Sequence, residues 1–367
     1  MASISSNPAS SSARLPQADV YDARHEQARD RQEQSSIRSP LRTLTGVQIL
    51  ATGSYVPEEV VRNEDLAQLG YDADWIVQRT GIRQRRRAAS WQATSDLAYE
   101  AARSCLDQAG ARPTDVDLVI LGTFTPDSPA PSSACRLAHR LDINAAAMDV
   151  NAACAGFMYA LVTGMQFVAS GCSQLALIVG ADVLSRVVNP ADKKTFPLFG
   201  DAAGAVLLGK GDQQQGLVWY TLGADGSGAD LLCIPGGGSR QPVSAEMLAD
   251  NLQYLSMDGR PVFKWAVRLL IDTIRQVLRQ AQLTVDDVDL VLLHQANIRI
   301  IDAAASDLGI ERDKLVVNLD RYGNTSAGSI PLALDEAHRE GRIKRGDHIL
   351  VSGFGAGLAW GTALLRW

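Results

Sequence analysis

The sequence has few cysteines and no long apolar run, and both features exclude classes of protein. Five of the 367 residues are cysteine, the number is odd, and no two of them stand in C-x-x-C spacing. A disulfide framework and a structural zinc site are therefore disfavoured, and reduced thiols in a cytoplasmic protein fit better. No apolar stretch approaches the roughly 18–20 residues of a membrane span, so we expect no membrane partner.

The chain also has no excess of positively charged residues. The chain has 35 Lys and Arg against 41 Asp and Glu, which gives a net charge of −6. A dedicated nucleic-acid-binding protein is usually basic, so we expect no nucleic-acid partner. The contents of 46% hydrophobic and 21% charged residues are typical of a globular protein.

Three common enzyme motifs do not occur. The sequence contains no G-x-x-x-x-G-K-[ST], no G-x-G-x-x-G and no G-x-S-x-G. P-loop nucleotide enzymes, Rossmann dehydrogenases and serine hydrolases with a nucleophile elbow therefore lose support.

Residues 1–43 differ in composition from the rest of the chain. A Ser-rich run without acidic residues (1–18) is followed by a charged run (19–38), and large apolar side chains are few. This composition predicts a disordered extension. The Ser-rich run also fits a transit peptide, although the acidic residues that follow argue against one.

From residue 44 onward, short apolar strands alternate with amphipathic helices. The pattern predicts strands at 47–51, 118–121, 145–150 and 290–293, and helices at 95–108, from 156 onward and at 298–308. Such alternation is typical of an α/β protein with a mainly parallel sheet.

An internal repeat with a constant offset runs through this region. Residues 115–121 (DVDLVIL) reappear at 287–293 (DVDLVLL), and 178–180 align with 350–352 at the same offset. The chain is therefore predicted to contain two copies of one unit, 44–215 and 216–367, with a cleft where the copies face each other. They differ where chemistry would sit, since the offset matches Cys154 with Ser326 and Gly122 with His294.

Cys154 is the candidate nucleophile. It follows a predicted strand and opens an apolar helical run, and small residues (Ala152, Ala153, Ala155 and Gly156) surround it. A thiol at a helix N-terminus meets the positive end of the helix dipole, which favours the thiolate. The small neighbours let a substrate come close. The other four cysteines are interpreted as small hydrophobic residues.

His294 and Asn324 are candidates for the rest of a site. His294 ends the predicted strand 290–293, at the edge where open α/β sheets bind ligands. Asn324 lies in a polar, Gly-rich turn, where a carboxamide is able to stabilise an oxyanion. A structural histidine and a turn or N-cap asparagine are the alternative interpretations. The stretch 352–361 predicts a glycine-rich turn between two strands, which brings backbone N–H groups to a ligand.

At these residues the chain resembles β-ketoacyl-acyl-carrier-protein synthase III, a family of condensing enzymes in the thiolase-like superfamily. The resemblance covers residues 45–367 and rests on the stretches 53–57, 74–83, 149–161, 199–204, 294–299, 322–326 and 360–364. It implies an α/β protein with a five-layered αβαβα fold made of two duplicated halves, and a homodimer.

The resemblance also implies the chemistry. Cys154 is expected to accept an acyl group, and His294 and Asn324 are expected to support decarboxylation of a malonyl thioester. The backbone N–H groups of Cys154 and Ala356 are expected to form an oxyanion hole, although the family usually has glycine at 356. Elongating synthases have a second histidine and thiolases a second cysteine, so Asn324 argues against both. No metal or cofactor is implied, because acyl-CoA and the malonyl carrier protein are substrates.

Residues that bind coenzyme A carry over by position. Trp75 and Arg79 match residues that hold its adenine, with core packing as the alternative for Trp75. Lys193 stands where the family often has arginine, and it is expected to meet a phosphate as a point charge. Phe354 is expected to face the acyl pocket.

Partner contacts carry over in the same way. Lys264 and Arg299 match a basic patch that docks the acidic acyl carrier protein, whereas Ser306 and Asp307 replace lysines of the family and weaken this match. Ala130 stands where some short-chain members carry phenylalanine at the end of the partner subunit's acyl pocket. We therefore expect primers longer than acetyl to be accepted.

The leading prediction is a cytoplasmic acyltransferase that initiates fatty acid synthesis. It would condense an acyl-CoA primer, loaded on Cys154, with malonyl-acyl-carrier protein. A related synthase or acyltransferase of secondary metabolism is the alternative. A non-catalytic scaffold has no need of a complete Cys154, His294 and Asn324 set, and a redox-sensing protein would need a resolving cysteine at a suitable spacing.

Overall fold

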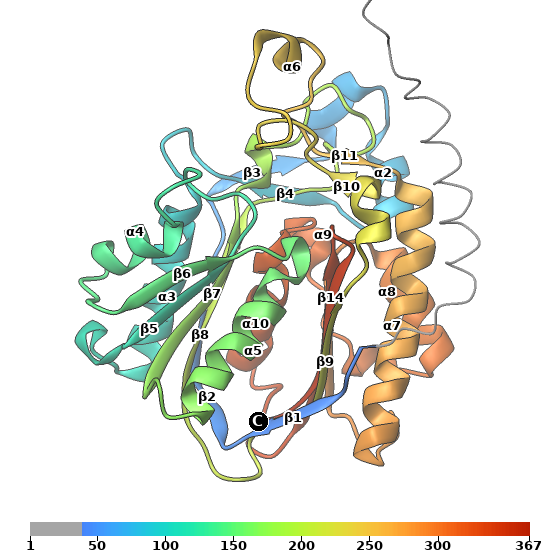
Figure 1. Cartoon of the computed structure of the whole chain (residues 1–367). Coiled ribbons are helices and arrows are strands. Elements are labelled where there is room, and N and C mark those ends of the chain that lie inside the picture. Colours follow the sequence, from blue (N-terminus) through green and yellow to red (C-terminus); the bar gives the residue numbers. More distant parts are fainter. Residues whose placement is uncertain (1–38) are drawn as a thin grey trace, which may run out of the picture. The chain divides into compact units, whose positions relative to one another are not determined.

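The computed structural model describes residues 39–367, whose elements form five layers (Figure 1). Two β-sheets enclose a central pair of helices, and further helices cover the outer face of each sheet. The predicted αβαβα arrangement of two duplicated halves is therefore confirmed.

The predicted extension 1–43 lies almost entirely outside the described residues, and its disorder stays a prediction. Its last two residues belong instead to strand β1 (Arg42–Thr45). This strand pairs antiparallel with β9 (Gly216–Ala224), so the start of the chain contributes to the sheet of the C-terminal half. Composition does not indicate β1, because Leu44 is its single large apolar residue.

The sheet of the N-terminal half has the strand order β2-β8-β7-β5-β6. The pairs β7-β5 and β5-β6 are parallel, whereas β2-β8 and β8-β7 are antiparallel. The strands are β2 (Val47–Tyr55), β5 (Leu118–Gly122), β6 (Ala146–Val150), β7 (Leu175–Asp182) and β8 (Ala202–Lys210).

The sheet of the C-terminal half has the order β1-β9-β14-β13-β12, and β12-β13 is its one parallel pair. Its remaining strands are β12 (Leu290–Leu293), β13 (His348–Gly355) and β14 (Ala359–Arg366). The prediction of mainly parallel sheets is wrong. Loops join β7 to β8 and β13 to β14, and without a long crossover helix each of these pairs runs antiparallel.

Helices supply the other three layers (Figure 1). The outer helices of the N-terminal half are α3 (Thr94–Ala109) and α4 (Ser133–Arg140), those of the C-terminal half are α7 (Gly259–Ala281) and α8 (Ile298–Leu308), and the central pair is α5 (Gly156–Ala169) and α10 (Ser329–Arg339). Most residues of α5 are buried, as expected for a helix between two sheets.

Several shorter elements lie between the main helices and strands. They are β3 (Glu59–Arg62), α2 (Ala73–Thr80), β4 (Gln84–Arg87), β10 (Leu232–Cys233), α6 (Ala245–Ala249), β11 (Ser256–Met257), α9 (Leu319–Tyr322), and the turns η3 (Ala153–Ala155) and η7 (Ser326–Gly328). Within residues 39–367, no helix has both the length and the apolar character needed to cross a membrane.

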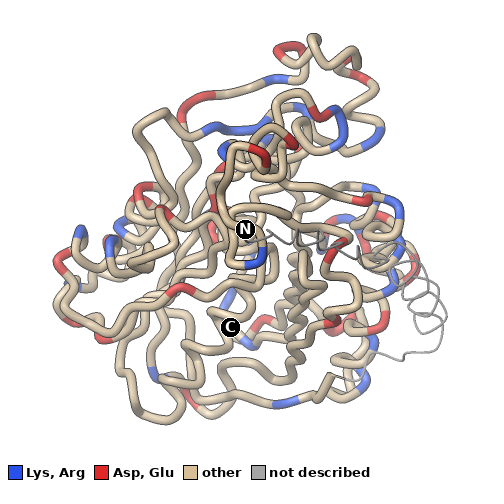
Figure 2. Tube along the Cα trace, turned by 45° about the horizontal axis from the view of Figure 1, so that its top comes forward, with Lys and Arg blue, Asp and Glu red and all other residues tan. Residues whose placement is uncertain are grey.

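Charged residues lie mainly around the outside of the fold, and the central layers carry few of them (Figure 2). The exceptions with no exposed surface are Arg85, Asp182, Asp201 and Asp335. Burial of a charge is costly unless it is hydrogen-bonded, so such residues mark places of specific structure. Asp182 lies beside the site described below.

The two copies keep the constant offset of the repeat at β5 and β12 but not beyond them. Leu118 of β5 pairs with Ala176 of β7, whereas Leu290 of β12 pairs with Ile349 of β13. Ala176 and Ile349 stand one position further apart in the chain than Leu118 and Leu290 do. The second copy therefore has one extra residue between its first core strand and β13.

This extra residue changes which residue corresponds to the cysteine. The turns η3 and η7 begin at Ala153 and Ser326, and these residues share a positive φ of 46° and 49°. Ser326 therefore corresponds to Ala153, and Cys154 corresponds to Ala327. The match of Cys154 with Ser326 is wrong by one position, because a constant offset cannot register a single insertion.

Gly204 on β8 lets α10 approach the N-terminal sheet. A Cβ there would lie 2.6 Å from the backbone N of Leu332 and 2.6 Å from the carbonyl C of Pro331. Backbone atoms cannot move aside as a flexible side chain does, so Gly204→Ala is expected to lower the free energy of unfolding by about 1–3 kcal/mol. Chemical denaturation measures the change. In Gly238→Ala the new Cβ has no atom within 4 Å and little change is expected; equal stability of the two variants would contradict this packing.

Candidate active site

Cys154 lies in η3, the helical turn between β6 and α5. The left-handed conformation of Ala153 turns the chain sharply just before it. Cys154 is 6% exposed. Burial raises the pKa of the Cys154 thiol to about 12, the Ser326 hydroxyl lowers it, and the Asp182 carboxyl raises it. Burial outweighs the helix effect that the sequence predicts, so the free protein carries a thiol at neutral pH.

His294 follows the last residue of β12, in the other half. Its backbone N–H donates to the carbonyl O of Ser352 (2.8 Å), and its ring lies edge-on to Phe354 with the centroids 5.2 Å apart. Burial lowers the pKa of His294 to about 3, so the ring is neutral at physiological pH. Nδ1 lies 3.1 Å from Ser329 Oγ. Among residues 39–367, Nε2 bonds to no protein group.

Asn324 lies between α9 and η7. Its backbone N–H donates to the carbonyl O of Leu198 (2.8 Å), and its carbonyl O accepts from the N–H of Gly200 (3.0 Å). Oδ1 accepts from the N–H of Ser326 (2.9 Å), so the oxygen does serve a turn, as the alternative interpretation holds. Within the described chain, Nδ2 bonds to no protein group, so its N–H groups stay available to a ligand.

Strand β13 brings the histidine near the cysteine. A Cβ on Gly355 would lie 2.7 Å from the backbone N of Cys154, so the strand passes directly beside the nucleophile because it has glycine there. The preceding residue, Phe354, contacts both His294 and the ring of Trp265. Phe354 thus lies against the histidine and is not part of the cavity described next.

Ser326 brings the asparagine near the cysteine. The turns η3 and η7 pack against each other. The Ser326 hydroxyl lies beside the Cys154 thiol, although without the geometry of a regular hydrogen bond, and its backbone N–H binds Asn324. The structure therefore gathers the three predicted residues from both halves.

A cavity of about 600 Å³ opens at Cys154. Residues of both halves line it, including Phe124, Tyr159, Leu232 and Ala356, and its mainly apolar walls suit an acyl chain. His294 and Asn324 are not among its lining residues. The cavity thus adjoins the Cys154 thiol rather than the side chains of His294 and Asn324.

Ala356 lies in the turn between β13 and β14, at the edge of this cavity. The positive φ in this turn belongs to Gly357 (139°), and Ala356 has none. Alanine therefore causes no backbone strain here, and it keeps the N–H that the predicted oxyanion hole needs. The N–H of Cys154 lies in the first turn of a helix, where amides have no acceptor within the helix.

Asp182, which the sequence analysis did not identify, lies beside Ala327, the residue of the other copy that corresponds to Cys154. Its carboxylate accepts from the N–H of Ala327 (3.1 Å), the counterpart of Cys154. It also accepts from the N–H groups of Phe124 (3.0 Å) and Thr125 (3.1 Å). In the second copy a carboxylate oxygen therefore accepts the backbone N–H that corresponds to the N–H of Cys154. The sequence signal that could have identified Asp182 is its position, as an acidic residue at the end of an apolar strand.

Trp75 and Arg79 lie on α2 near Lys193. Trp75 is 37% exposed, which argues against core packing, and the Arg79 guanidinium lies 5.5 Å from its ring centroid. Tyr71, which sequence reasoning missed, stacks on Trp75 with the centroids 3.9 Å apart, and the Lys193 ammonium lies 5.6 Å from the Tyr71 ring. Rings flanked by cations suit a flat aromatic ligand. A purine would have to use the face of Trp75 that Tyr71 leaves free, or displace the Tyr71 ring.

The remaining predicted residues lie on the surface. Lys264 on α7 and Arg299 on α8 are exposed on neighbouring helices, and the Arg299 guanidinium lies 5.7 Å from the ring of Phe263, next to Lys264. Ala130 is exposed and does not line the cavity of its own chain. Asp307, where the family has a lysine, pairs with a basic residue of α7 (2.7 Å).

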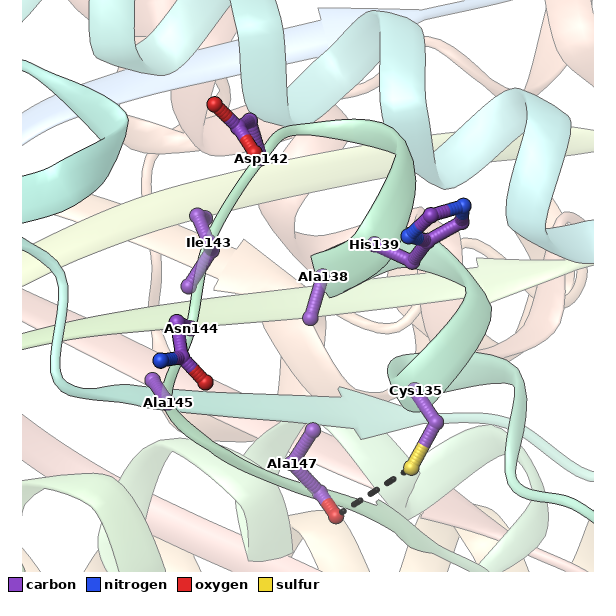
Figure 3. Close-up of a pocket in the computed structure, with 8 residues that line it drawn as sticks. All are labelled: Cys135, Ala138, His139, Asp142, Ile143, Asn144, Ala145 and Ala147. Atoms are coloured by element: carbon purple, nitrogen blue, oxygen red, sulfur yellow. Dashed lines mark hydrogen bonds between the residues drawn. The ribbon is translucent and has the colours of Figure 1, made fainter.

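A second cavity of about 340 Å³ lies between α4 and β6 (Figure 3). Its lining includes Cys135, His139 and Asn144 but none of the predicted site residues. The Cys135 thiol points to the carbonyl O of Ala147 on β6, 3.9 Å away. This cavity borders the outer edge of the N-terminal sheet.

The duplicated αβαβα fold, with a buried cysteine where its two halves meet, defines the class of protein: a thiolase-like condensing enzyme. Comparisons narrow this class. Residues 148–226 and 278–367 match the profiles described as 3-oxoacyl-[acyl-carrier-protein] synthase III and its C-terminal part. The chain is 56% identical over 342 residues to the beta-ketoacyl-[acyl-carrier-protein] synthase III of Rhodopirellula baltica, which covers 88% of this chain and 99% of the relative.

Solved structures agree. The 3-oxoacyl-[acyl-carrier-protein] synthase III of Aquifex aeolicus matches with a TM-score of 0.81 and 41% identity, over 88% of this chain and 100% of that one. A priming β-ketosynthase of a polyketide biosynthetic pathway matches with a TM-score of 0.80 and 35% identity, over 90% and 99%. The chain therefore belongs to the 3-oxoacyl-[acyl-carrier-protein] synthase III family and is an acyl-transferring condensing enzyme.

The buried thiol predicts how alkylation depends on pH. Because the pKa of Cys154 is raised to about 12, its thiolate fraction in the free protein should rise about tenfold per pH unit between about pH 7 and 9. Peptide mass spectrometry after short exposure to iodoacetamide measures the rate at Cys154, with the exposed Cys172 as a reference for the reagent. A rate at Cys154 that is already constant above neutral pH would contradict this account.

Proposed function

We propose that Cys154 accepts an acyl group from acyl-CoA and that the acyl enzyme condenses with malonyl-acyl-carrier protein, with loss of CO₂, to initiate fatty acid synthesis. The observation that carries the proposal is that His294 Nε2 and Asn324 Nδ2 have no hydrogen-bond partner in the described chain, while the segments that carry them pack around the buried Cys154 thiol. A neutral pair of donors suits an oxygen that becomes negative during reaction.

The first step is a thioester exchange. The sulfur of Cys154 attacks the acyl carbonyl carbon, coenzyme A leaves as a thiol with the proton of Cys154, and an acyl-cysteine remains. The N–H groups of Cys154 and Ala356 stabilise the tetrahedral intermediate. The apolar cavity at the thiol holds the acyl chain. One thioester replaces another, so the exchange is nearly thermoneutral.

The second step forms the carbon–carbon bond. The malonyl group loses CO₂ and leaves an enolate, whose oxygen accepts from His294 and Asn324. One such donor typically contributes about 3–4 kcal/mol to the transition state. The enolate carbon attacks the acyl-cysteine, and Cys154 leaves and takes up a proton. Every step uses groups of the chain and the two substrates, so no metal or cofactor is required. The described residues contain no cluster of three or more His, Cys, Asp or Glu arranged to hold a metal.

Substrate binding follows from the surface residues. The exposed Trp75 with Arg79 and Lys193 binds the nucleotide part of coenzyme A, by stacking and by charge. Lys264 and Arg299 dock the acidic carrier protein. The acidic Asp307, already paired with a basic residue of α7, weakens this docking relative to a surface with lysine there.

The chain acts as a homodimer in the cytoplasm, where the carrier protein and coenzyme A occur. Strand β6 is the edge of the N-terminal sheet and is partly exposed, and its four other residues besides Asp149 are apolar. An unprotected edge strand of this kind favours pairing with a second copy. The cavity between α4 and β6 lies along this edge (Figure 3), and the exposed Ala130 would reach the other copy's acyl pocket.

An acyltransferase or synthase of secondary metabolism is the second candidate. The likeness to a priming β-ketosynthase of a polyketide pathway favours it. Both functions begin with an acyl-cysteine and differ in the acceptor, so discharge of the acyl group separates them.

Intact mass spectrometry tests the proposal. The wild-type protein should gain the mass of one acyl group from acyl-CoA, and malonyl-acyl-carrier protein should remove it. Cys154→Ala should gain none, whereas Cys172→Ala, at an exposed cysteine, should load as the wild type does. An adduct that the malonyl carrier cannot discharge would favour the second candidate. Loading of Cys154→Ala would contradict the nucleophile assignment.

Chain length tests the role of Ala130. Turnover of acetyl-, butyryl- and octanoyl-CoA should show that the wild type accepts primers longer than acetyl. Ala130→Phe should lower kcat/KM for octanoyl-CoA by about tenfold or more relative to acetyl-CoA, because the added ring shortens the pocket. A strict acetyl preference of the wild type would contradict this expectation.

A further inference from the structure

Ser329, the first residue of α10, lies between the catalytic histidine and the residue that follows it. The serine is 1% exposed. Its Oγ accepts the backbone N–H of Gln295 at 2.8 Å and lies 3.1 Å from Nδ1 of His294. Both neighbours are themselves held in place, so the contact is a fixed part of the site.

The backbone N–H of Gln295, which donates to Ser329, is held in a fixed direction. The side chain of Gln295 is buried, and its Nε2 donates to the carbonyl O of Leu293 (2.8 Å) and of Val316 (3.0 Å). Its Oε1 accepts the N–H of Asn318 (3.0 Å). With the side chain anchored on both sides, the backbone N–H of Gln295 keeps its direction and always occupies one lone pair of Ser329.

The hydroxyl of Ser329 then has one acceptor to which it can donate its hydrogen bond. The hydrogen bonds of residues 39–367 include no acceptor for it other than His294 Nδ1. If Nδ1 carried the ring proton, it would face a second donor, and a buried O–H would be left without a partner, which is unfavourable. Donation by Ser329 requires an unprotonated Nδ1, and in a neutral imidazole the proton then lies on Nε2.

We infer that Ser329 is a positioning residue that fixes the tautomer of His294 with the proton on Nε2. This inference rests on the proposed function, in which Nε2–H stabilises the enolate oxygen. With the proton on Nδ1, the free nitrogen would present a lone pair to that oxygen and repel it. Ser329 thus acts on decarboxylation through His294, and it has no part in the loading of Cys154.

NMR of ¹⁵N-labelled histidine tests the tautomer directly. The chain has five histidines, and His294→Ala identifies the signal of His294. The wild type should show a neutral ring with the proton on Nε2 between about pH 6 and 9, since burial lowers the pKa of His294 to about 3. Ser329→Ala should show Nδ1–H or a mixture of both forms, and Ser329→Thr, which keeps the hydroxyl, should retain Nε2–H. A wild-type proton on Nδ1 would overturn the inference.

Half-reactions test the consequence. Ser329→Ala should load acyl-CoA at the wild-type rate and discharge to malonyl-acyl-carrier protein about 10- to 100-fold more slowly, by analogy with the loss of groups that orient metal-ligating histidines. Ser329→Thr should recover most of the rate. Ser173→Ala controls for a general loss of stability. It removes a buried hydroxyl at a residue that is distant from Ser329 in the sequence, and it should discharge normally.

The two ways of failing are distinct. An unchanged tautomer and an unchanged discharge rate in Ser329→Ala would overturn the role of the serine while leaving the proposed function intact. Normal discharge by His294→Ala would instead remove the proposed function, and the NMR spectrum would still decide the tautomer.

Discussion

The active site depends on how closely the two halves approach each other. The turn η3 of the first half packs against η7 and β13 of the second. At Gly355 a Cβ would lie 2.7 Å from the backbone N of Cys154, and at Gly180 on β7 a Cβ would lie 2.2 Å from the carbonyl O of Ala327. Glycine at both places lets each sheet touch the other half's turn. The predicted nucleophile of one half, Cys154, therefore lies next to segments of the other half that carry His294 and Asn324.

The duplication also explains why the two corresponding places are not equivalent. Three matched pairs that differ lie around the site: Cys154 and Ala327, Gly122 and His294, and Asp182 and Gly355. In the copy with the thiol, the strand beside it ends in glycine and leaves a cavity. In the other copy the strand ends in an aspartate, whose carboxylate takes the backbone N–H. In the proposed reaction, one copy carries the reacting thiol and the other supplies the histidine and asparagine.

Much of this was predictable from the sequence, and the failures have physical causes. Strands 118–121 and 290–293, the helix 298–308 and the candidates Cys154, His294 and Asn324 depend on local patterns and a recognisable resemblance. Strand direction depends on what joins the strands, so the parallel prediction failed where loops replace crossover helices. Tyr71, Asp182 and Ser329 act through contacts between distant segments, and a single sequence does not reveal such contacts.

The central claim is that His294 and Asn324 stabilise the enolate whether or not the nucleophile is present. Release of CO₂ from malonyl-acyl-carrier protein by Cys154→Ala tests it most directly, with His294→Ala or Asn324→Ala added in the same chain. The account predicts that Cys154→Ala still releases CO₂ and leaves an acetyl carrier, and that either added substitution slows the release about 100-fold or more. Abolished release in Cys154→Ala alone, or unchanged release in the double variants, would contradict it.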